Sequence, residues 1–278
     1  MAGRQGAPEG APTGEDRTDG VAQAGSDWQY GYGADGVAVV RFERGEREGR
    51  PWADRLEAVD PGTDPAALAA FVRTELAGWV VSGPVRLGEE LVRQGAAVLR
   101  HGHTMHRDLT DAPPPGGWAV WADTPLRDGF RAVPCDRGAE ALVPASRAAF
   151  GPGHPDHRPD EGWDDRSSAR RIAELLSGQV IGPPLPASSL VVDGSDLVVA
   201  GAVVTDWDGL PWIAHVFRHP AHGYPGLGRD LLRRVVAEVA ADGAARIGLA
   251  VTEGNRARQL YEELGFTTTH SSLTVVVP

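Results

Sequence analysis

The chain has 278 residues, a net charge of −11, and 41% hydrophobic and 23% charged residues. This composition is typical of a globular protein, and the negative charge argues against nucleic acid as a partner while suiting a cationic small molecule. No apolar run approaches the roughly 18 residues of a membrane span, and the single cysteine, Cys135, excludes an intrachain disulfide. We therefore expect a cytoplasmic protein with no membrane partner.

Shifts in composition divide the chain into four parts. Residues 1–27 are rich in Gly, Ala, Pro and acidic side chains, so a disordered tail without a signal peptide is predicted. Residues 28–110 are expected to form a small α/β domain. Three consecutive prolines open a predicted linker over 111–129. Residues 130–278 form the second and larger unit.

The first unit alternates short strands with helices. The helix after Asp64 has the best support, because Asp64 suits the N-cap and Pro65 the first helical position. The predicted strands are Val37–Phe42, Trp79–Val81 and Ala96–Leu99, and the predicted helices are Pro51–Val59, Asp64–Ala77 and Leu87–Arg93.

The second unit contains consecutive antiparallel strands, which do not fit a Rossmann order. In two expected hairpins, a turn that contains glycine connects the two strands. The predicted strands are Phe130–Val133, Ser189–Val192, Leu197–Asp206, Trp212–Phe217, Ile247–Val251, Phe266–Thr269 and Leu273–Val277. The predicted helices are Ala139–Phe150, Ser167–Leu176, one from the glycine loop to about Asp242, and Asn255–Leu264.

A glycine-rich turn between the strand Trp212–Phe217 and the following helix is the centre of the second unit. It reads Gly223-Tyr224-Pro225-Gly226-Leu227-Gly228. The free N–H groups and positive dipole of a helix start bind phosphate, and glycine lets the phosphate approach the main chain. We therefore predict a phosphate-bearing ligand at this turn.

Two motifs together resemble the GNAT superfamily of acyl-CoA-dependent N-acetyltransferases over residues 130–278. The glycine turn is similar to the family's Arg/Gln-x-x-Gly-x-Gly/Ala loop, with Gly223 in place of the leading Arg or Gln. Downstream, residues 251–266 are similar to Asn-x-x-Ala-x-x-Leu-Tyr-x-x-x-Gly-Phe, with Asn255 displaced by one position. The resemblance implies a mixed α/β fold with a splayed central sheet flanked by helices.

The resemblance also implies acetyl-CoA as co-substrate and gives roles to individual residues. Tyr261 stands at the position of the general acid, and a main-chain amide near Val216 or Phe217 would polarise the thioester carbonyl. The residues expected to bind the coenzyme are Val216, Phe217, Arg218, Gly223, Tyr224, Pro225, Gly226, Leu227, Gly228, Arg229 and Asn255.

The general base is not evident in the sequence. Where family members often carry one, this chain has Trp212 and Ala214. His215 is a candidate, although alternation along the strand predicts that it faces away from Ala214. Glu253, at the end of the next strand, is a second candidate, and a solvated loop charge is its alternative role. For the acceptor, the acidic and aromatic segment Phe150–Arg166 suits a cationic amine, unless it is only a solvated loop.

The first unit resembles a shortened copy of the second. Trp79–Gly95 aligns without gaps with Leu249–Gly265, but it has no glycine loop and no tyrosine at the acid position. An independent origin is the alternative for so short a match. No metal site is predicted, because His101, His103 and His106 have no acidic partner at a helpful spacing.

These observations predict an N-acetyltransferase in which an amine, expected to belong to a small molecule, attacks the thioester directly. The alternatives are a catalytically weakened acyl-CoA-binding or regulatory module, and an acetyltransferase of protein N-termini or lysines. The oligomeric state, monomer or homodimer, is left open.

Overall fold

The computed structural model describes residues 28–47, 49–118, 126–127, 129–157 and 164–278. The predicted disordered tail, part of the predicted linker and part of the segment Phe150–Arg166 lie outside the described residues. No helix in the described ranges is both long and apolar enough to cross a membrane.

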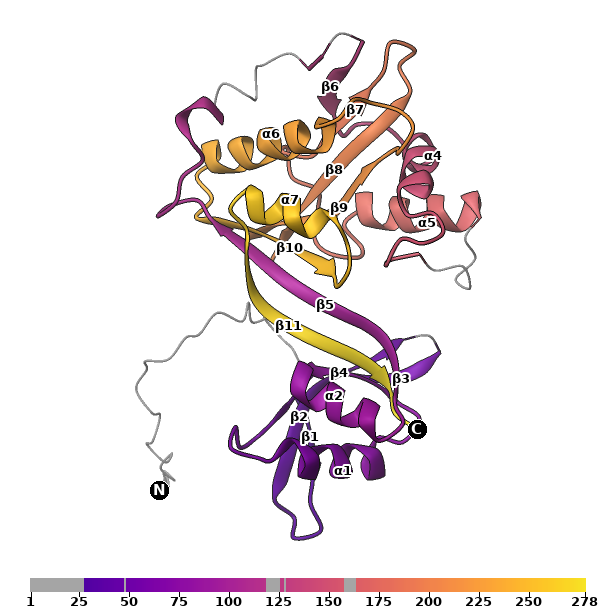
Figure 1. The fold of residues 1–278 in the computed structure, drawn as a ribbon, viewed down its shortest axis with the longest axis vertical. Coiled ribbons are helices and arrows are strands. Elements are labelled where there is room, and N and C mark those ends of the chain that lie inside the picture. The colour runs from indigo at the N-terminus through magenta and orange to yellow at the C-terminus, as the bar shows by residue number, and fades with distance from the viewer. Residues whose placement is uncertain (1–27, 48, 119–125, 128, 158–163) are drawn as a thin grey trace, which may run out of the picture.

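Two lobes share one sheet of eleven strands, counted over the described residues (Figure 1). The strand order is β1-β2-β3-β4-β11-β5-β10-β9-β8-β7-β6. The strands are β1 (Trp28–Tyr32), β2 (Ala38–Arg47), β3 (Arg50–Ala58), β4 (Val80–Pro84), β5 (Ala97–Asp108), β6 (Arg131–Pro134), β7 (Ser189–Val192), β8 (Val198–Trp207), β9 (Leu210–Arg218), β10 (Arg246–Thr252) and β11 (Thr267–Val276).

In the larger lobe, helices pack on both faces of the sheet. In the smaller lobe, the helices pack on one shared core. The helices are α1 (Pro65–Glu75), α2 (Val85–Arg93), α4 (Ala139–Ala149), α5 (Asp165–Leu176), α6 (Leu227–Ala241) and α7 (Ala257–Glu263). Helices α6 and α7 pack on one core with β8, β9 and β10, while α4 and α5 pack on a second core with β7 and Phe217. Helices α1 and α2 pack on a third core in the first unit. Asp64 caps α1 as predicted, since its side chain accepts a hydrogen bond from the Ala67 N–H.

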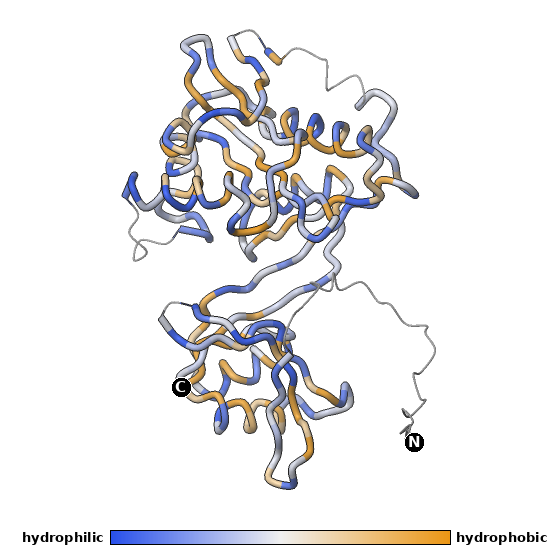
Figure 2. The backbone as a smooth tube through the Cα atoms, turned by 180° about the vertical axis from the view of Figure 1, so that it is seen from behind, coloured by the Kyte–Doolittle hydropathy of each residue, from blue (hydrophilic) through white to orange (hydrophobic). Residues whose placement is uncertain are grey.

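The two units exchange their long strands at the centre of the sheet. Strand β5 of the first unit lies between β10 and β11, and β11 of the second unit lies between β5 and β4, all antiparallel. Figure 1 shows these two strands as the connection between the lobes. The tube is pale to blue along this crossing, and hydrophobic residues gather in the lobes on either side (Figure 2).

The first unit repeats the element order of the second. Both run strand, strand, helix, strand, helix, strand: β2-β3-α1-β4-α2-β5 and β8-β9-α6-β10-α7-β11. In each unit a helix connects two parallel strands, β3 to β4 and β9 to β10. Each of these parallel pairs is aligned at only two positions, the first of which is Trp52 in β3 and Trp212 in β9. The helix after each parallel pair ends at a glycine with positive φ, Gly95 (φ 99°) and Gly265 (φ 84°).

The predicted helix Pro51–Val59 is wrong, because this segment is strand β3. The register between β2 and β3 shifts there, and Arg55 has a φ of 51°, so one extra residue bulges out. Ala53 and Leu56 are consequently both buried although they are three positions apart. A β-bulge thus imitated the i, i+3 spacing of a helix.

Two further predictions need correction. The separate closing strands Phe266–Thr269 and Leu273–Val277 are one continuous strand, β11, which keeps its course through two register shifts. Strand Ala96–Leu99 continues to Asp108 as the twelve-residue β5. Both strands are longer than predicted because polar residues of the crossing still pair with the other unit.

Candidate active site

The site begins where β9 and β10 separate. The parallel pair is bonded only at Trp212↔Gly248 and Ile213↔Leu249, so the strands splay beyond these positions, as the resemblance implied. On the other side of β9, the register with β8 shifts between His215 and Ile213, which places a bulge at Ala214. Among the described residues, the stretch of β9 after Ile213 thus has a strand partner on one side only.

The bulge changes the direction of His215. Ala214 and His215 both line the same pocket, whereas simple alternation predicted that they face opposite ways. An extra residue in a strand resets the alternation, so two consecutive side chains share a face. His215 is therefore directed into the cavity, and the prediction that it turns away from Ala214 is wrong.

The glycine turn leads into α6 in a conformation that suits an anion. Gly226 has a φ of 97° at the N-cap, and a Cβ there would meet no protein atom within 4 Å. The first helical hydrogen bond runs from the Asp230 N–H to the Gly226 carbonyl, so the N–H groups of Gly228 and Arg229 precede the intrahelical ladder. This backbone fits a phosphate group, with room for the phosphate to approach Gly226.

Other residues near the turn fix the turn itself. The Tyr224 ring is buried, and its hydroxyl donates to Asp230 at 2.8 Å. Burial, followed by the Asp230 contact, raises the pKa of Tyr224 to about 12. Arg218 donates to the carbonyls of His219 and Pro220, and Arg229 pairs with Glu263. Tyr224 and Arg218 therefore stabilise the conformation of the loop through contacts within the protein.

Tyr261 lies buried on α7 near an acidic side chain. Its ring contacts Phe266 edge to face, with ring centroids 6.1 Å apart. Burial, and secondly the charge of Asp156, raise the pKa of Tyr261. The hydroxyl consequently stays protonated over the working pH range of an enzyme and can act only as a proton donor there.

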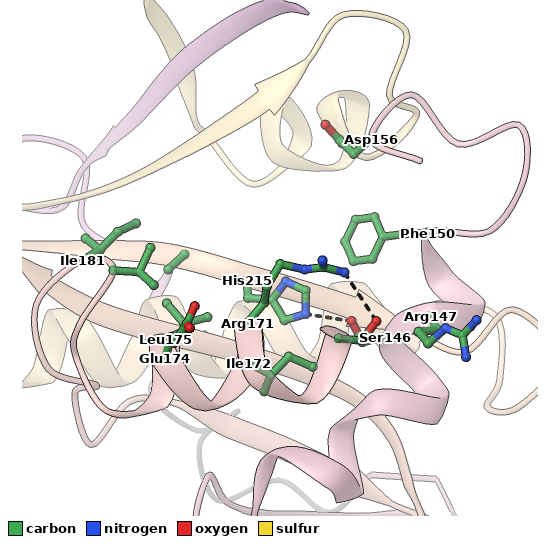
Figure 3. Close-up of a pocket in the computed structure, with 13 residues that line it drawn as sticks. Ser146, Arg147, Phe150, Asp156, Arg171, Ile172, Glu174, Leu175, Ile181 and His215 are labelled. Carbon is green, nitrogen blue, oxygen red and sulfur yellow. Dashed lines mark hydrogen bonds between the residues drawn. The ribbon is translucent and has the colours of Figure 1, made fainter. Parts of the chain in front are cut away.

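A pocket of about 500 Å³ lies between α4, α5 and β9 (Figure 3). Both signs of charge occur around it, with Asp156 and Glu174 as carboxylates and Arg147 and Arg171 as guanidinium groups. Figure 3 shows Asp156 across the cavity from Arg171 and His215. Apolar side chains, among them Phe150, Ile172, Leu175 and Ile181, complete the lining.

His215 is held against α4 at the base of this pocket. Its Nε2 and the Ser146 hydroxyl are 2.9 Å apart, and its ring stacks on Phe150 at an interplanar angle of 22°. Burial lowers the pKa of His215 to about 4. The imidazole is therefore neutral near pH 7.

Asp156 links the pocket to β10 and to the first unit. Its carboxylate accepts hydrogen bonds from the Thr252 hydroxyl and, at 3.4 Å, from the Asn255 amide. Arg100 of β5 donates to the same Thr252 hydroxyl at 3.1 Å. A side chain of the first unit thus reaches the network that positions Asp156.

Residues 141–266 match the model of the acetyltransferase (GNAT) family. Over these residues, a little under half of the chain, the protein is similar to GNAT acetyltransferases.

One curated relative is the L-methionine sulfoximine/L-methionine sulfone acetyltransferase of Salmonella typhimurium strain LT2. It is 34% identical over 115 residues, which are 38% of this chain and 65% of that protein. The chain therefore matches slightly less than two thirds of the length of this relative.

Solved GNAT structures share the fold over most of the chain. A GCN5-related N-acetyltransferase from Sphaerobacter thermophilus superposes with a TM-score of 0.60 at 18% identity and covers 92% of this chain and 81% of its own. A tandem GNAT protein from the clavulanic acid biosynthesis pathway gives a TM-score of 0.54 at 15% identity, covering 87% and 79%. Both comparisons include the first unit, and they concern the fold alone.

Glu253, within the part that matches the GNAT model, lies apart from the pocket lining. Its carboxylate contacts His103 at 2.6 Å and Arg258 at 3.2 Å, and the side chain is 53% exposed. The hydrogen bond from His103 is the largest of the contacts that lower the pKa of Glu253. Asn255, expected to bind coenzyme, caps the start of α7 through the Ala257 N–H as well as contacting Asp156.

The acidic residues of the segment that leads into α5 have different contacts. Asp156 faces the pocket, Asp164 caps α5 through the Ser167 N–H, and Asp165 pairs with Arg147. Sequence reasoning did not single out Arg100, Arg171 or Ser146. Arg171 was recognisable only as one of several arginines on a predicted helix, and Arg100 required the strand exchange.

Proposed function

We propose that the protein is an acetyl-CoA-dependent N-acetyltransferase that acetylates the amino group of a small amino-acid-like molecule. The observation that carries the proposal is the pocket with opposite charges beside the splayed strands and Tyr261. Acetyl-CoA would supply the acetyl thioester, whose carbonyl the amine attacks directly. The match of residues 141–266 to the GNAT family model supports this reaction type.

Each part of the coenzyme site has a role in this proposal. The first-turn amides of α6, with Gly226, hold the pyrophosphate. A main-chain N–H near Val216 or Phe217, on the open edge of β9, acts as the oxyanion donor. Tyr261, kept protonated by its raised pKa, gives its proton to the departing thiolate. Cys135 is not needed as a nucleophile, because burial raises its pKa to about 11 and it does not line the pocket.

Asp156 is our choice for the group that binds the ammonium and receives its proton. It lines the pocket and is the charge that acts on Tyr261, so it marks the end of the pocket nearest the reaction. Neutral His215 offers a polar nitrogen on the opposite wall. The predicted base Glu253 has less support, since His103 and Arg258 hold its carboxylate outside the pocket lining.

Arg171 favours an acceptor that also carries a carboxylate. Its side chain crosses the pocket below Phe150, opposite Asp156 (Figure 3). An α-amino acid could place its ammonium at Asp156 and its carboxylate at Arg171, a pairing for which guanidinium groups are well suited. The curated relative is named for two derivatives of L-methionine, which supports this acceptor class.

The test is release of coenzyme A thiol over matched pairs of L-amino acids and their α-amides. We expect amino acids to be preferred, and Arg171→Gln to raise KM for the acids about 10–100-fold while leaving the amides unchanged. Arg166→Gln, on an exposed position of the same helix, is the control. Equal effects on acids and amides would contradict the carboxylate role. Coenzyme binding without turnover of any amine would instead indicate a binding module.

A further inference from the structure

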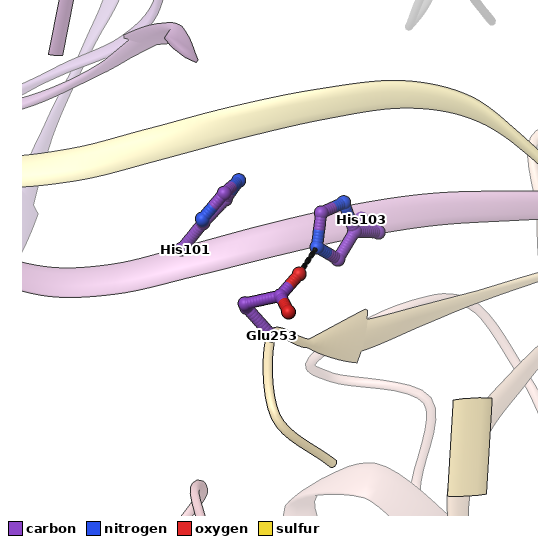
Figure 4. A group of neighbouring side chains, drawn as sticks. All are labelled: His101, His103 and Glu253. Atoms are coloured by element: carbon purple, nitrogen blue, oxygen red, sulfur yellow. Dashed lines mark hydrogen bonds and ion pairs between the residues drawn. The ribbon is translucent and has the colours of Figure 1, made fainter. Parts of the chain in front are cut away.

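The crossing of the two units brings together three potential metal ligands that lie far apart in sequence. One ligand atom each from His101, His103 and Glu253 lies within 4.8 Å of the other two (Figure 4). Their spacing along the chain had argued against a metal site, because no acidic residue lies near the histidines in sequence. The strand exchange supplies that carboxylate from about 150 positions away.

Strand register explains why the three side chains share a face. His101 and His103 are two positions apart on β5, so both project on the same side of the sheet. His103 is opposite Val251 of β10, and the Glu253 N–H continues the ladder by bonding the His101 carbonyl at 2.8 Å. Backbone hydrogen bonds therefore fix the positions of all three residues.

The surroundings of His103 are those of an oriented ligand. The ring is nearly buried, with 6% of the side chain exposed, and its Nδ1 is 2.8 Å from the Ser271 hydroxyl of β11. Metal-binding histidines usually have the second ring nitrogen fixed by such a partner. Nε2 is left directed at Glu253, at 2.6 Å. Glu253 and His101 are more accessible, which leaves a path for an ion.

Arg258 places a positive charge next to His101, His103 and Glu253, and this charge opposes the binding of a cation. Arg258 contacts Glu253 through Oε2, the same oxygen that faces His103. Among the described residues, Oε1 has no such contact and remains available to a cation. A carboxylate that binds a metal through one oxygen and an arginine through the other is a sound arrangement, since ligating carboxylates are commonly hydrogen-bonded in turn.

We propose that His101, His103 and Glu253 bind a divalent transition-metal ion, with Zn²⁺ the best match. Two imidazoles and one carboxylate are a donor set that Zn²⁺ accepts, with a fourth position for water. Bonds of about 2.0–2.1 Å need ligand atoms roughly 3.4 Å apart in a tetrahedron. On binding, the His101 ring must therefore move toward the other two, and the Glu253 carboxylate must turn so that Oε1 replaces the hydrogen bond of 2.6 Å between Oε2 and His103 Nε2. The ion would connect β5 of the first unit to the end of β10 in the second.

The experiment measures Zn²⁺ binding to the full-length chain, freed of any affinity tag, by calorimetry, with Co²⁺ absorption as a second readout. We expect one ion per chain, a rise of several degrees in Tm, and visible d–d bands of tetrahedral Co²⁺. Glu253→Gln, at an exposed turn position that tolerates change, should weaken binding at least 100-fold, as should His103→Gln. Ser271→Ala should weaken it about tenfold through loss of ring orientation.

Two control variants separate this site from other histidines. His106→Gln removes a β5 histidine whose ring contacts Thr269, and His222→Gln disrupts the His219–His222 ring pair of the glycine loop. Both should retain Zn²⁺ binding. The proposal is overturned if the unchanged protein binds Zn²⁺ no more tightly than Glu253→Gln, or if either control loses the ion to the same extent. These readouts do not depend on acetyl transfer.

Discussion

At the scale of single residues, the Tyr261 hydroxyl is the most direct point to test. We expect Tyr261→Phe to lower kcat about 100-fold, since a general acid typically contributes 10²–10⁴-fold, and to leave KM for acetyl-CoA nearly unchanged. Steady-state thiol release measures both constants. Tyr30→Phe, which alters an exposed tyrosine of β1, should retain full activity. Turnover by Tyr261→Phe within threefold of the unchanged enzyme would assign the proton to another donor.

His215 makes the stability of the fold depend on pH. The unfolded state binds a proton near pH 6.5, whereas the native imidazole does so only near its lowered pKa of about 4. Protonation therefore favours the unfolded state, and the free energy of unfolding falls as the pH decreases from about 6.5 towards 4. Between pH 7 and pH 5 this group accounts for a loss of about 2 kcal/mol.

Urea unfolding at pH 7 and pH 5 checks this expectation. The difference in unfolding free energy between the two pH values should be smaller by about 2 kcal/mol in His215→Gln than in the unchanged protein. Comparing the variant with the parent cancels the titration of the other groups. An identical pH dependence in both proteins would show that the native imidazole is protonated as easily as the unfolded one.

At the scale of elements, the start of α6 offers a matched pair of glycines. Gly226 (φ 97°) precedes the helix and Gly243 (φ 83°) follows it, and a Cβ at either position would meet no atom within 4 Å. Alanine should cost roughly 1–2 kcal/mol of stability at both, because each adopts a left-handed conformation. Only Gly226→Ala also places a methyl group on the proposed phosphate path.

We therefore expect Gly226→Ala to raise the Kd of coenzyme A at least tenfold and Gly243→Ala to leave it unchanged. Isothermal titration gives the Kd, and thermal unfolding gives the matched loss of stability. Equal coenzyme affinities in the two variants would remove the glycine turn from the coenzyme site.

Elements marked by a local sequence pattern were predictable from the sequence, whereas strands that contain a bulge were not. The apolar stripe and cap of α1, and the strand, glycine turn and helix around Gly226, are local patterns that the structure reproduces. The bulge at Arg55 turned a strand into an apparent helix, and the bulge at Ala214 reversed the expected direction of His215. A bulge depends on the partner strand, and a single segment does not reveal its partner.

The contacts across the two units were also beyond sequence reasoning. Arg100 reaches Thr252, and Glu253 reaches His103, across about 150 positions, and only the exchange of β5 and β11 brings them together. The internal alignment of Trp79–Gly95 with Leu249–Gly265 indicated similar units. It carried no information on how one unit pairs with the other.

At the scale of the whole molecule, the shared sheet predicts that the second unit does not fold alone. Residues 111–278 lack β4 and β5, so β11 has no partner on either side and β10 loses an antiparallel partner along its full length. We expect this fragment to show no cooperative thermal transition by circular dichroism. Co-expression with residues 1–110 should restore one. A lone fragment that is monomeric and unfolds cooperatively would contradict the expectation.

The long sequence separation between β5 and β11 affects how the protein is made. Strands β4 and β5 are complete once Asp108 has been translated, but the strand that lies between them ends at Val276. At ribosomal rates of about 5–20 residues per second, their edges wait roughly 10–30 s for that partner. Exposed edges invite pairing between nascent chains. The histidines and arginines of β5 discourage such pairing until β11 has been translated.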